Sequence, residues 1–542
     1  MGSRILSFLG MFILSALPAW SQTGEEWKDE YSRFSDSSPW IRSSNPAGIS
    51  SPLTGRLSTV RAWFEKKNGG LIDLHESPNC LKPGLEAASY MKVSDRITFY
   101  GRVDYSYFKG KDMGGPILLD PYYNPINFVE NSDTTTGSKT LEKYTLEGAM
   151  AYSLTNRLTL AGKVSYQSAD YAKRKDPRAY NQWMDLDASL GAKYSLPRGK
   201  AAFGVSLRYT KTIETVLEKL FGTIDRQYYY LIDYGASFGK VEVVEGDNGF
   251  VSVSYERPMF NQFFGGSAQA EFSVGGVNTF IDLGAAYRSG YFGKKGSGTV
   301  KFCDYDGMRY DLGVRVTFKT GKFYNRIDGN WNIMTSLNKE NSYRVSTKPG
   351  QSSEIQYFGS QEVGDKTVGR IKARYSIERQ ADGHKGIFGP VPWALSVGYE
   401  RFGVNQTATS YPFYRKQRIA RNTVNLTGVK NFPMGNNFLS ITLGGDYSFA
   451  GDDLKNEDGQ YSSATGNPRT NDTYLNRNFE YFHASSAGGT ASVRFTLVKE
   501  TGRRHYSVFM DLADSYHRLT SDPEYLTGNY RNTIIFTIGC NF

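Results

Sequence analysis

The chain is poor in cysteine: only Cys80, Cys303 and Cys540 occur among its 542 residues. A small, odd number of cysteines in a chain of this size does not make a disulfide framework, which excludes the small disulfide-stabilised secreted folds. Cys80 and Cys303 both fall near strand ends expected on the same side of the fold. The sequence is therefore compatible with two alternatives, a disulfide bridge between these two residues or three unpaired thiols.

The chain also lacks the repeated apolar runs of about 20 residues that a helical membrane protein needs. Its one long apolar stretch, Ile5–Leu17, is too short to span a bilayer, follows Arg4 and precedes Ala19-Trp20-Ser21. This is the pattern of a cleaved secretory signal, so residues 1–21 are expected to be removed on export before Gln22. The net charge of +10 is spread along the chain. No nucleic-acid partner is expected for an exported protein of this kind.

Catalytic and metal-binding motifs are missing as well. None of the five histidines lies in a Gly-x-Ser-x-Gly or His-Glu-x-x-His context, and neither a Cys/His metal spacing nor a phosphate-binding glycine loop occurs. His517, with Asp514 and Ser515 nearby, is the one place where a catalytic grouping can be imagined, but adjacency in sequence is not a triad. We therefore predict a protein that is not an enzyme, with no cofactor and no metal.

What the chain has in quantity is aromatic residues, glycine and alternation. It contains 38 Tyr, 33 Phe, 7 Trp and 57 Gly. Apolar and polar residues alternate strictly through 97–107, 144–154, 186–196, 312–319 and 439–449. Such stretches indicate strands with one apolar and one polar face. Their length, about 10 to 13 residues, matches the 9–11 that a tilted strand needs to cross a membrane, whereas globular strands are mostly of 5–6 residues.

The connections between these segments also alternate in length. Short turns are expected at places such as Val93–Arg96 and Lys319–Lys322, and long polar links at Lys109–Thr140, Lys339–Lys366 and Gly451–Phe479. Short turns at one end and long loops at the other are typical of outer-membrane barrels. We therefore predict an all-β fold: a transmembrane antiparallel β-barrel over residues 57–542, with roughly 18 strands (range about 14–20) and an even number. Two points stay open, the number of crossings within Val241–Val274 and whether Arg61–Glu65 spans fully.

The C-terminal residues support an outer-membrane location. Ile534, Phe536, Ile538 and Phe542 lie on one face of the last expected strand, with Cys540 where an aromatic residue is common. This stretch resembles the C-terminal signal by which the barrel assembly machinery recognises its substrates. The resemblance implies the Gram-negative outer membrane as location, and outer-membrane lipid and the assembly machinery as partners. It also implies that Phe542 and the short turns are periplasmic.

Residues 22–56 do not follow the strand pattern. Trp27, Tyr31 and Phe34 share one face of a possible short helix over Glu25–Phe34. The hatch candidates of this segment are Trp27, Trp40, Asn45, Pro46, Ala47 and Gly48. The Asn-Pro-Ala tripeptide resembles the N-terminal hatch of FadL-like channels and of related barrels that serve as subunits of a secretion system. The alternatives are a hatch inside the lumen and a simple periplasmic tail.

The mature chain as a whole resembles a family of outer-membrane barrels of unassigned function. The resemblance is carried by Asn45–Gly48 and by the basic segment Lys173–Arg178. It implies a fold and a location, not an activity. The residues alone favour a solvated loop for the basic segment over an anion site.

If the apolar faces meet lipid, the intervening polar residues line the lumen. The lumen-lining candidates are Arg102, Asp104, Glu147, Lys163, Arg208, Asp282, Arg315, Arg374, Asp446 and Arg494. Charges of both signs so deep in a barrel need water or partners, and a mixed set does not predict selectivity for one ion. The favoured function is a channel or transporter for a small solute or a moderately apolar compound. The alternative is a structural or partner subunit of a larger envelope or secretion complex.

Overall fold

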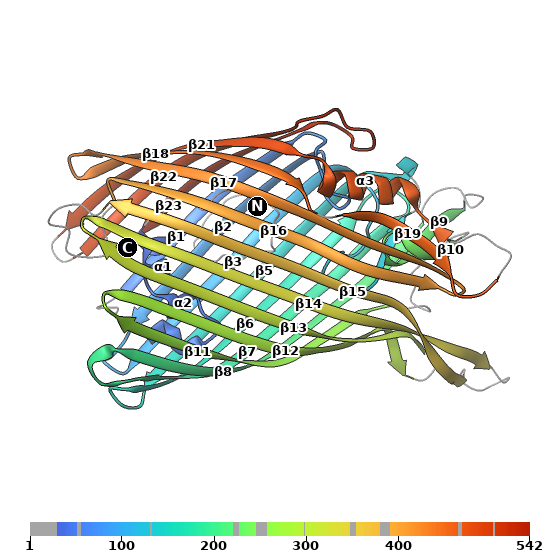
Figure 1. Cartoon of the computed structure of the whole chain (residues 1–542), viewed down its shortest axis with the longest axis horizontal. Coiled ribbons are helices and arrows are strands. Elements are labelled where there is room, and N and C mark those ends of the chain that lie inside the picture. The colour runs from blue at the N-terminus through green and yellow to red at the C-terminus, as the bar shows by residue number, and fades with distance from the viewer. Residues whose placement is uncertain are drawn as a thin grey trace, which may run out of the picture.

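The structure, a computed structural model, describes residues 30–50, 56–130, 133–220, 227–244, 257–296, 299–346, 354–379, 391–451, 453–463, 469–501 and 504–542. In this part of the chain, eighteen antiparallel strands form a closed barrel (Figure 1), so the predicted fold class is confirmed. The signal segment and Trp27 lie outside the described residues.

The barrel strands differ widely in length. They are β1 (Arg56–Asn68), β2 (Asn79–Lys92), β3 (Ile97–Met113), β5 (Gly137–Ser153), β6 (Leu158–Lys173), β7 (Arg178–Ser195), β8 (Ala201–Lys219), β11 (Met259–Val274), β12 (Val277–Gly296), β13 (Thr299–Thr320), β14 (Phe323–Ser346), β15 (Glu354–Arg379), β16 (Trp393–Ser410), β17 (Phe413–Met434), β18 (Asn437–Ala450), β21 (Ser486–Thr501), β22 (Arg504–Leu519) and β23 (Tyr530–Asn541). A further strand, β19 (Leu454–Gln460), pairs with the first residues of β17.

The barrel closes where β23 pairs with β1 in register, Phe64 lying opposite Phe536. Ser58 and Phe542 exchange both backbone hydrogen bonds, at 2.8 and 3.0 Å, and the guanidinium of Arg56 lies 5.3 Å from the Phe542 ring centroid. The outward side chains of this last strand, Ile534, Phe536, Ile538 and Phe542, are exposed on the barrel surface. Closure leaves no unpaired sheet edge for lipid to meet.

The outer surface carries a band of exposed apolar side chains such as Leu190 and Leu207. Aromatic pairs lie near both edges of the band: Tyr209 packs on Phe264 near one edge, with ring centroids 4.8 Å apart, and Phe203 on Phe272 near the other, at 5.7 Å. This arrangement is that of a membrane-spanning barrel with aromatic girdles. No described helix is long and apolar enough to cross a membrane.

The two ends of the barrel carry different connections. Tight turns join strands at one end, here called the turn end, for example between β2 and β3 or β13 and β14. The opposite loop end carries the long connections between β3 and β5, β8 and β11, and β18 and β21. Some connections at the loop end are short, such as Arg174–Pro177, so the predicted alternation of lengths is incomplete.

Several predicted links contain regular structure instead. Most of Lys339–Lys366 is strand, because β14 and β15 continue to pair up to Ser346 opposite Glu354. A strand that extends beyond the membrane no longer needs an apolar face. This part of β14 and β15 is therefore polar in sequence, and its residues alone predict a loop. Gly451–Phe479 contains β19 and most of α3 (Asp472–His483), and Lys109–Thr140 contains the short strand β4 (Asn127–Glu130). In the described part of Val241–Val274, which excludes residues 245–256, β11 is the crossing strand, and Arg61–Glu65 lies inside β1.

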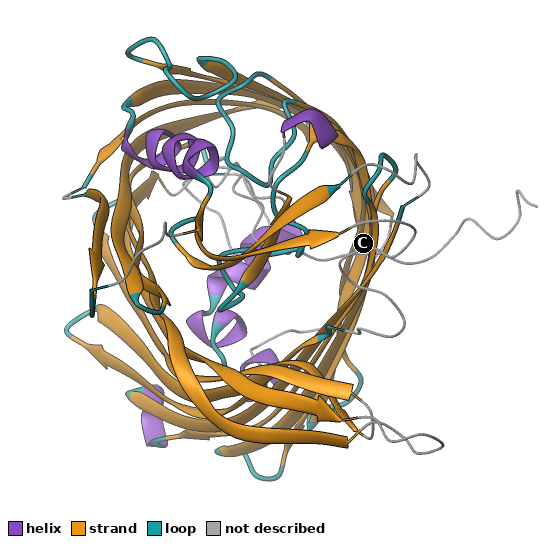
Figure 2. Ribbon diagram, turned by 90° about the vertical axis from the view of Figure 1, so that its right-hand side faces the viewer, coloured by secondary structure: helices purple, strands orange, loops and turns teal. Residues whose placement is uncertain are grey.

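Chain segments also occupy the interior, as the end-on view of Figure 2 shows. Towards the turn end lie the elements before β1: α1 (Glu30–Ser37), α2 (Pro39–Arg42) and the 3-10 turn η1 (Pro46–Ser50). Towards the loop end lies a four-stranded sheet in the order β20 (Arg469–Thr470), β10 (Phe238–Val244), β9 (Tyr228–Gly235) and β4. The 3-10 turn η2 (Asp133–Thr135) follows β4, and the 3-10 turn η3 (Pro197–Gly199) joins β7 to β8 at the turn end. Cys80 and Cys303 are buried and unpaired, so the bridge left open by the sequence does not form.

The outer surface predicts a depth-dependent effect of charge. Leu207, at mid-band on β8, is 70% exposed, whereas Val274, 75% exposed, adjoins the turn between β11 and β12. Leu207→Arg should lower the free energy of unfolding by about 2–4 kcal/mol and Val274→Arg by about 0–1 kcal/mol. Urea titration of protein refolded in vesicles measures both. Equal costs at the two positions would contradict a membrane band centred on Leu207.

Candidate functional site

Asn45 fastens the N-terminal segment to the inner wall. Its side-chain Nδ2 donates to the carbonyl oxygens of Ala192 (2.9 Å) and Val205 (3.1 Å), which are register partners on β7 and β8, and to Oε1 of Gln269 (2.8 Å). Asn45 fits there because the wall beside it is glycine. A Cβ on Gly191 would lie 2.1 Å from Asn45 Oδ1, and one on Gly204 would lie 2.7 Å from Nδ2. The two glycines thus form a notch for this side chain.

Trp40 fixes the same segment further along the wall. It is buried, packs edge-on against Phe280 with centroids 5.2 Å apart, and donates from Nε1 to Glu271 at 2.5 Å. The ammonium of Lys193 lies 4.5 Å from its ring centroid, within the range of a cation–π contact. Gly48 packs directly on the backbone of Trp40, where a Cβ would lie 1.8 Å from its carbonyl oxygen.

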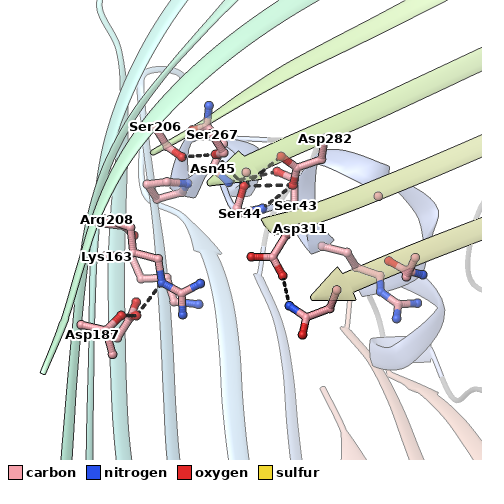
Figure 3. A pocket seen from close by; sticks show the side chains of 18 of the residues that line it. Ser43, Ser44, Asn45, Lys163, Asp187, Ser206, Arg208, Ser267, Asp282 and Asp311 are labelled. Atoms are coloured by element: carbon pink, nitrogen blue, oxygen red, sulfur yellow. Dashed lines mark hydrogen bonds and ion pairs between the residues drawn. The ribbon is translucent and has the colours of Figure 1, made fainter. Parts of the chain in front are cut away.

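Polar contacts complete the attachment. Ser44 donates from its backbone and its hydroxyl to Asp282 at 2.9 Å, and its Oγ lies 2.7 Å from that of Ser267 (Figure 3). Arg315 donates to the carbonyl oxygen of Asp36 at 2.7 Å. We call residues 30–50 the hatch segment. The described hatch segment is therefore held by backbone carbonyl groups of β7 and β8 and by side chains of β11, β12, β13 and β14.

The loop end is filled by a separate aromatic and apolar cluster. Tyr122 packs against Phe402 and Phe482, at 5.6 and 5.9 Å between centroids, and its hydroxyl donates to both oxygens of Asp73 at 3.0 and 2.9 Å. Burial raises the pKa of Asp73, against the opposing effect of nearby His75. Lys366 extends from β15 and donates to the carbonyl oxygens of Pro121 and Asn124, which fastens this loop to the wall.

Between the hatch segment and the loop-end cluster lies a cavity of about 1170 Å³, here called the chamber (Figure 3). Hatch residues such as Tyr31 and Ser44 line it from one side, Tyr122 and Tyr123 from the other, and the barrel wall surrounds it. A second cavity of about 340 Å³ adjoins it and shares Asp282, Arg370 and Lys372.

The structure distributes the predicted lumen residues over these two cavities. The chamber is lined by Arg102, Glu147, Lys163, Arg208, Asp282 and Arg494, and the adjoining cavity by Asp282, Arg315, Arg374 and Asp446. Asp104 lines neither and is buried on β3. Of the hatch candidates, Asn45 and Pro46 line the chamber, while Trp40, Ala47 and Gly48 are buried.

Ion pairs link most of these charges within the wall. Glu147 lies between Lys163, a close contact, and Arg102 at 3.6 Å. Arg494 pairs with Asp511 at 2.8 Å, Arg315 with Asp328 at 2.6 Å, and His517 lies 3.0 Å from Asp446. Asp514 points to the opposite face of β22 from Ser515 and His517, so the grouping imagined from the sequence does not form.

Some lining residues were missed by the sequence reading. Arg309 and Asp311 belong to the same alternating face as Gly313 and Arg315, and extending that alternation backwards would have found them. Tyr122 and Tyr123 come from an irregular loop and carry no such signal. Within the described residues, no group of three or more His, Cys, Asp or Glu side chains is arranged to hold a metal ion.

Fold and site together define an outer-membrane β-barrel with an N-terminal segment lodged in its lumen. The chain belongs to the family described as "Family of unknown function (DUF6850)", whose model matches residues 46–542. No curated protein matches the chain.

Solved structures give distant likenesses. The outer membrane transporter YddB from Escherichia coli is 7% identical, covering 89% of this chain and 81% of its own, with a TM-score of 0.38. The ferric-catecholate import receptor Fiu from E. coli K12, in its open form, is 8% identical over 90% and 81%, with a TM-score of 0.38. The alcaligin outer-membrane receptor FauA from Bordetella pertussis is 9% identical over 89% and 76%, at 0.31. These likenesses are too distant to carry a substrate or an activity over to this chain.

The contacts of Asn45 predict how firmly the hatch segment is held. Asn45→Ala removes all three hydrogen bonds to the wall, and each such bond is worth about 1 kcal/mol net. Hydrogen exchange in a peptide covering residues 45–50 should become at least about tenfold faster, measured by mass spectrometry of the full chain in detergent. Ser50→Ala, which removes only a bond to Ala47 within the segment, is the control. Equal exchange in the two variants would contradict the anchoring role of Asn45.

Proposed function

We propose that this chain is a gated, non-enzymatic outer-membrane channel or transporter for a small polar solute. The hatch segment closes the lumen at the periplasmic turn end, and the folded loops close it at the outer end. The observation that supports this most is the chamber itself. A cavity of about 1170 Å³ lies between the hatch segment and the loop-end cluster, and a concave space with convergent polar groups is a typical binding site for a small molecule.

The nature of the two closures favours gating over a purely structural filling. The hatch segment is joined to the wall in part by hydrogen bonds and ion pairs, such as those of Asn45 and Ser44, which water can replace on release. The other part is an apolar cluster in which Tyr31, Phe34 and Ile49 pack against wall residues such as Tyr90. A barrel of 16–18 strands is wide enough to leave an aqueous channel once its lumen is cleared. The charged wall of the chamber favours a polar solute over an apolar one.

The location and the assembly route belong to the same proposal. Residues 1–21 direct export and are cleaved, and Ile534, Phe536, Ile538 and Phe542 are read by the barrel assembly machinery. The exposed outward face of these four side chains supports such reading, because a recognition element must be accessible before the barrel closes.

A second candidate function is that of a partner subunit in an envelope complex. It is favoured by the β14–β15 hairpin, whose strands of 24 and 26 residues far exceed the 9–11 needed to span the membrane. The hairpin projects beyond the rest of the loop end (Figure 1) and exposes Tyr343, Tyr357 and Phe358 near its tip. Exposed aromatic residues on a projecting element are a common feature of protein interfaces.

Gating predicts a conductance that depends on the hatch notch. A Val side chain at Gly204 would overlap Asn45 and Trp40 and displace the hatch segment. Single-channel recordings in planar bilayers should show rare openings for the full chain and a mean conductance about tenfold higher or more for Gly204→Val. Gly148→Val is the matched control, because a Cβ there meets nothing within 4 Å. If the full chain, Gly204→Val and a variant lacking residues 30–50 all fail to conduct, the channel proposal is wrong.

The partner-subunit candidate predicts a specific contact at the hairpin tip. A photo-crosslinking residue placed at Phe358 in living cells should give a discrete adduct of higher mass, and one placed at Tyr525, exposed on a different outer loop, should not. The products are separated by gel electrophoresis and identified by mass spectrometry. Absence of any adduct from position 358, together with purification as a conducting monomer, would argue for the channel alone.

A further inference from the structure

One row of inward-facing residues crosses the barrel wall at the level of the chamber. Strand register places Lys163 opposite Ser189, Ser189 opposite Arg208, and Arg208 opposite Gly265. The row continues through Ala286 to Arg309 on β13. All six residues line the chamber. Three cations therefore lie in one register row of the wall, and only serine, glycine and alanine stand between them in that row.

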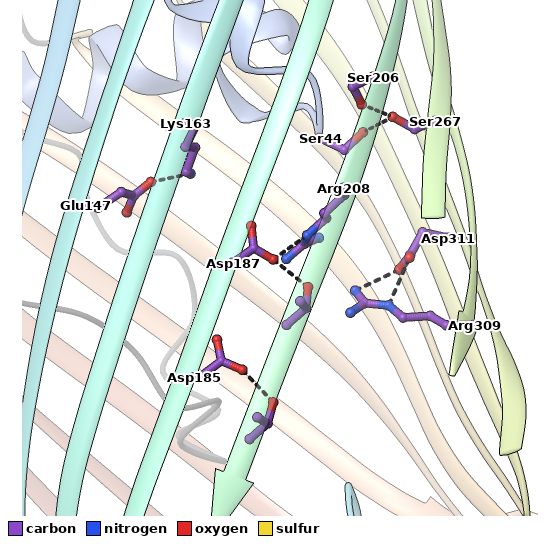
Figure 4. A network of polar contacts seen from close by, with 12 residues as sticks. Ser44, Glu147, Lys163, Asp185, Asp187, Ser206, Arg208, Ser267, Arg309 and Asp311 are labelled. Carbon is purple, nitrogen blue, oxygen red and sulfur yellow. Dashed lines mark hydrogen bonds and ion pairs between the residues drawn. The ribbon is translucent and has the colours of Figure 1, made fainter. Parts of the chain in front are cut away.

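The carboxylates that pair with the first two cations lie in the neighbouring row and recede into the wall. Arg208 donates from Nε to Asp187 at 2.5 Å, and Asp187 also accepts from Thr210 at 2.7 Å (Figure 4). The side chain of Arg208 is 43% exposed, against 11% for Asp187. Lys163 is likewise 35% exposed, against 8% for Glu147. Glu147 and Asp187 also line the chamber, but the two cations are the more exposed partners of these pairs.

Arg309, the third cation of the row, pairs with a carboxylate on its own strand. It contacts Asp311 through Nε at 2.9 Å and Nη2 at 3.1 Å, and both side chains face the chamber. Figure 4 shows the guanidinium of Arg208 beside Asp187 and that of Arg309 beside Asp311. Because Gly265 and Ala286 are small, no bulky side chain of the row separates the two guanidinium groups.

Aromatic rings border the chamber on its loop side. Tyr123 and Phe263 line it, and the buried guanidinium of Arg288 lies 4.9 and 5.5 Å from their ring centroids. Arg288 is oriented by Asn261, whose Oδ1 accepts from Nε and Nη2 at 3.0 and 2.6 Å. A third positive charge on an arginine therefore stands directly behind these rings, where little water screens it.

We propose that the chamber binds a small organic anion through Lys163, Arg208 and Arg309, with its carboxylate or phosphate groups spanning the three cations. Arginine suits this task because its planar guanidinium can pair with two oxygens of such a group at once. The remainder of the solute lies against Tyr123 and Phe263. This inference rests on the proposed transport function and names the class of solute that the chamber takes.

Isothermal titration calorimetry of the full chain in a non-ionic detergent tests the proposal. Citrate is the carboxylate probe, pyrophosphate the phosphate probe, and maltotriose an uncharged comparison, all at 0.15 M NaCl. At least one anion should bind saturably at one site, and maltotriose should not. Arg208→Gln and Arg309→Gln should each weaken that binding about tenfold or more. Arg96→Gln, in the exposed turn between β2 and β3, is the matched control and should leave it unchanged.

Arg208→Gln and Arg309→Gln disrupt different ion pairs, so a similar loss of binding in both is not explained by one local folding defect. Heat-modifiable migration on gels checks that both variants form closed barrels. No saturable binding of either anion by the wild-type chain overturns the proposal. So does a loss of affinity in Arg96→Gln equal to that in Arg208→Gln. The channel proposal fails separately: anion binding without conductance leaves the anion site standing, whereas conductance without anion binding removes only the site.

Discussion

The whole structure depends on one constraint, that every backbone N–H and C=O in the hydrocarbon region must find a partner within the protein. A sheet satisfies this only if it closes, and here the seam between β1 and β23 does so by a regular antiparallel register. Closure in turn imposes alternation on each crossing, because one side chain of every two meets lipid and the next meets the lumen. The inward face can therefore carry polar residues, and the segments inside the lumen are held by polar contacts together with local apolar clusters.

This constraint explains why the hatch segment is built as it is. Apolar surface inside the barrel is limited to patches, such as the one around Tyr90 on which Tyr31 and Phe34 pack. The segment adds to this packing the amide of Asn45, the indole N–H of Trp40 and the hydroxyl of Ser44, each of which donates to a wall group. The glycine notch on β7 and β8 brings the backbone of the wall within reach of those groups.

Most of the barrel could be predicted from the sequence because membrane crossing forces strict alternation, as in 144–154 and 439–449. The alternation of apolar and polar residues is lost where a strand extends beyond the membrane. The outer halves of β14 and β15 run in water, so their polar sequence around 339–366 resembles a loop. Likewise, β4 pairs with β9 and β20 pairs with β10 across 100 residues of sequence or more, and no local pattern predicts such pairing. The Asn45-Pro46-Ala47 tripeptide drew attention to the segment before β1, but nothing in the sequence indicated that Gly191 and Gly204 would lie beside Asn45.

The small sheet at the loop end has a consequence for how the barrel admits anything from outside. Its strands come from three different loops, β4 from the first, β9 and β10 from the second, and β20 from the third, and backbone hydrogen bonds join them into one ladder. Arg415 ties the ladder to the wall by donating to the carbonyl oxygen of Ala236 and to Asp458. Three loops joined in this way cannot move independently. If the barrel is gated as proposed, the three loops have to move as one unit, and the backbone hydrogen bonds of the ladder oppose that movement.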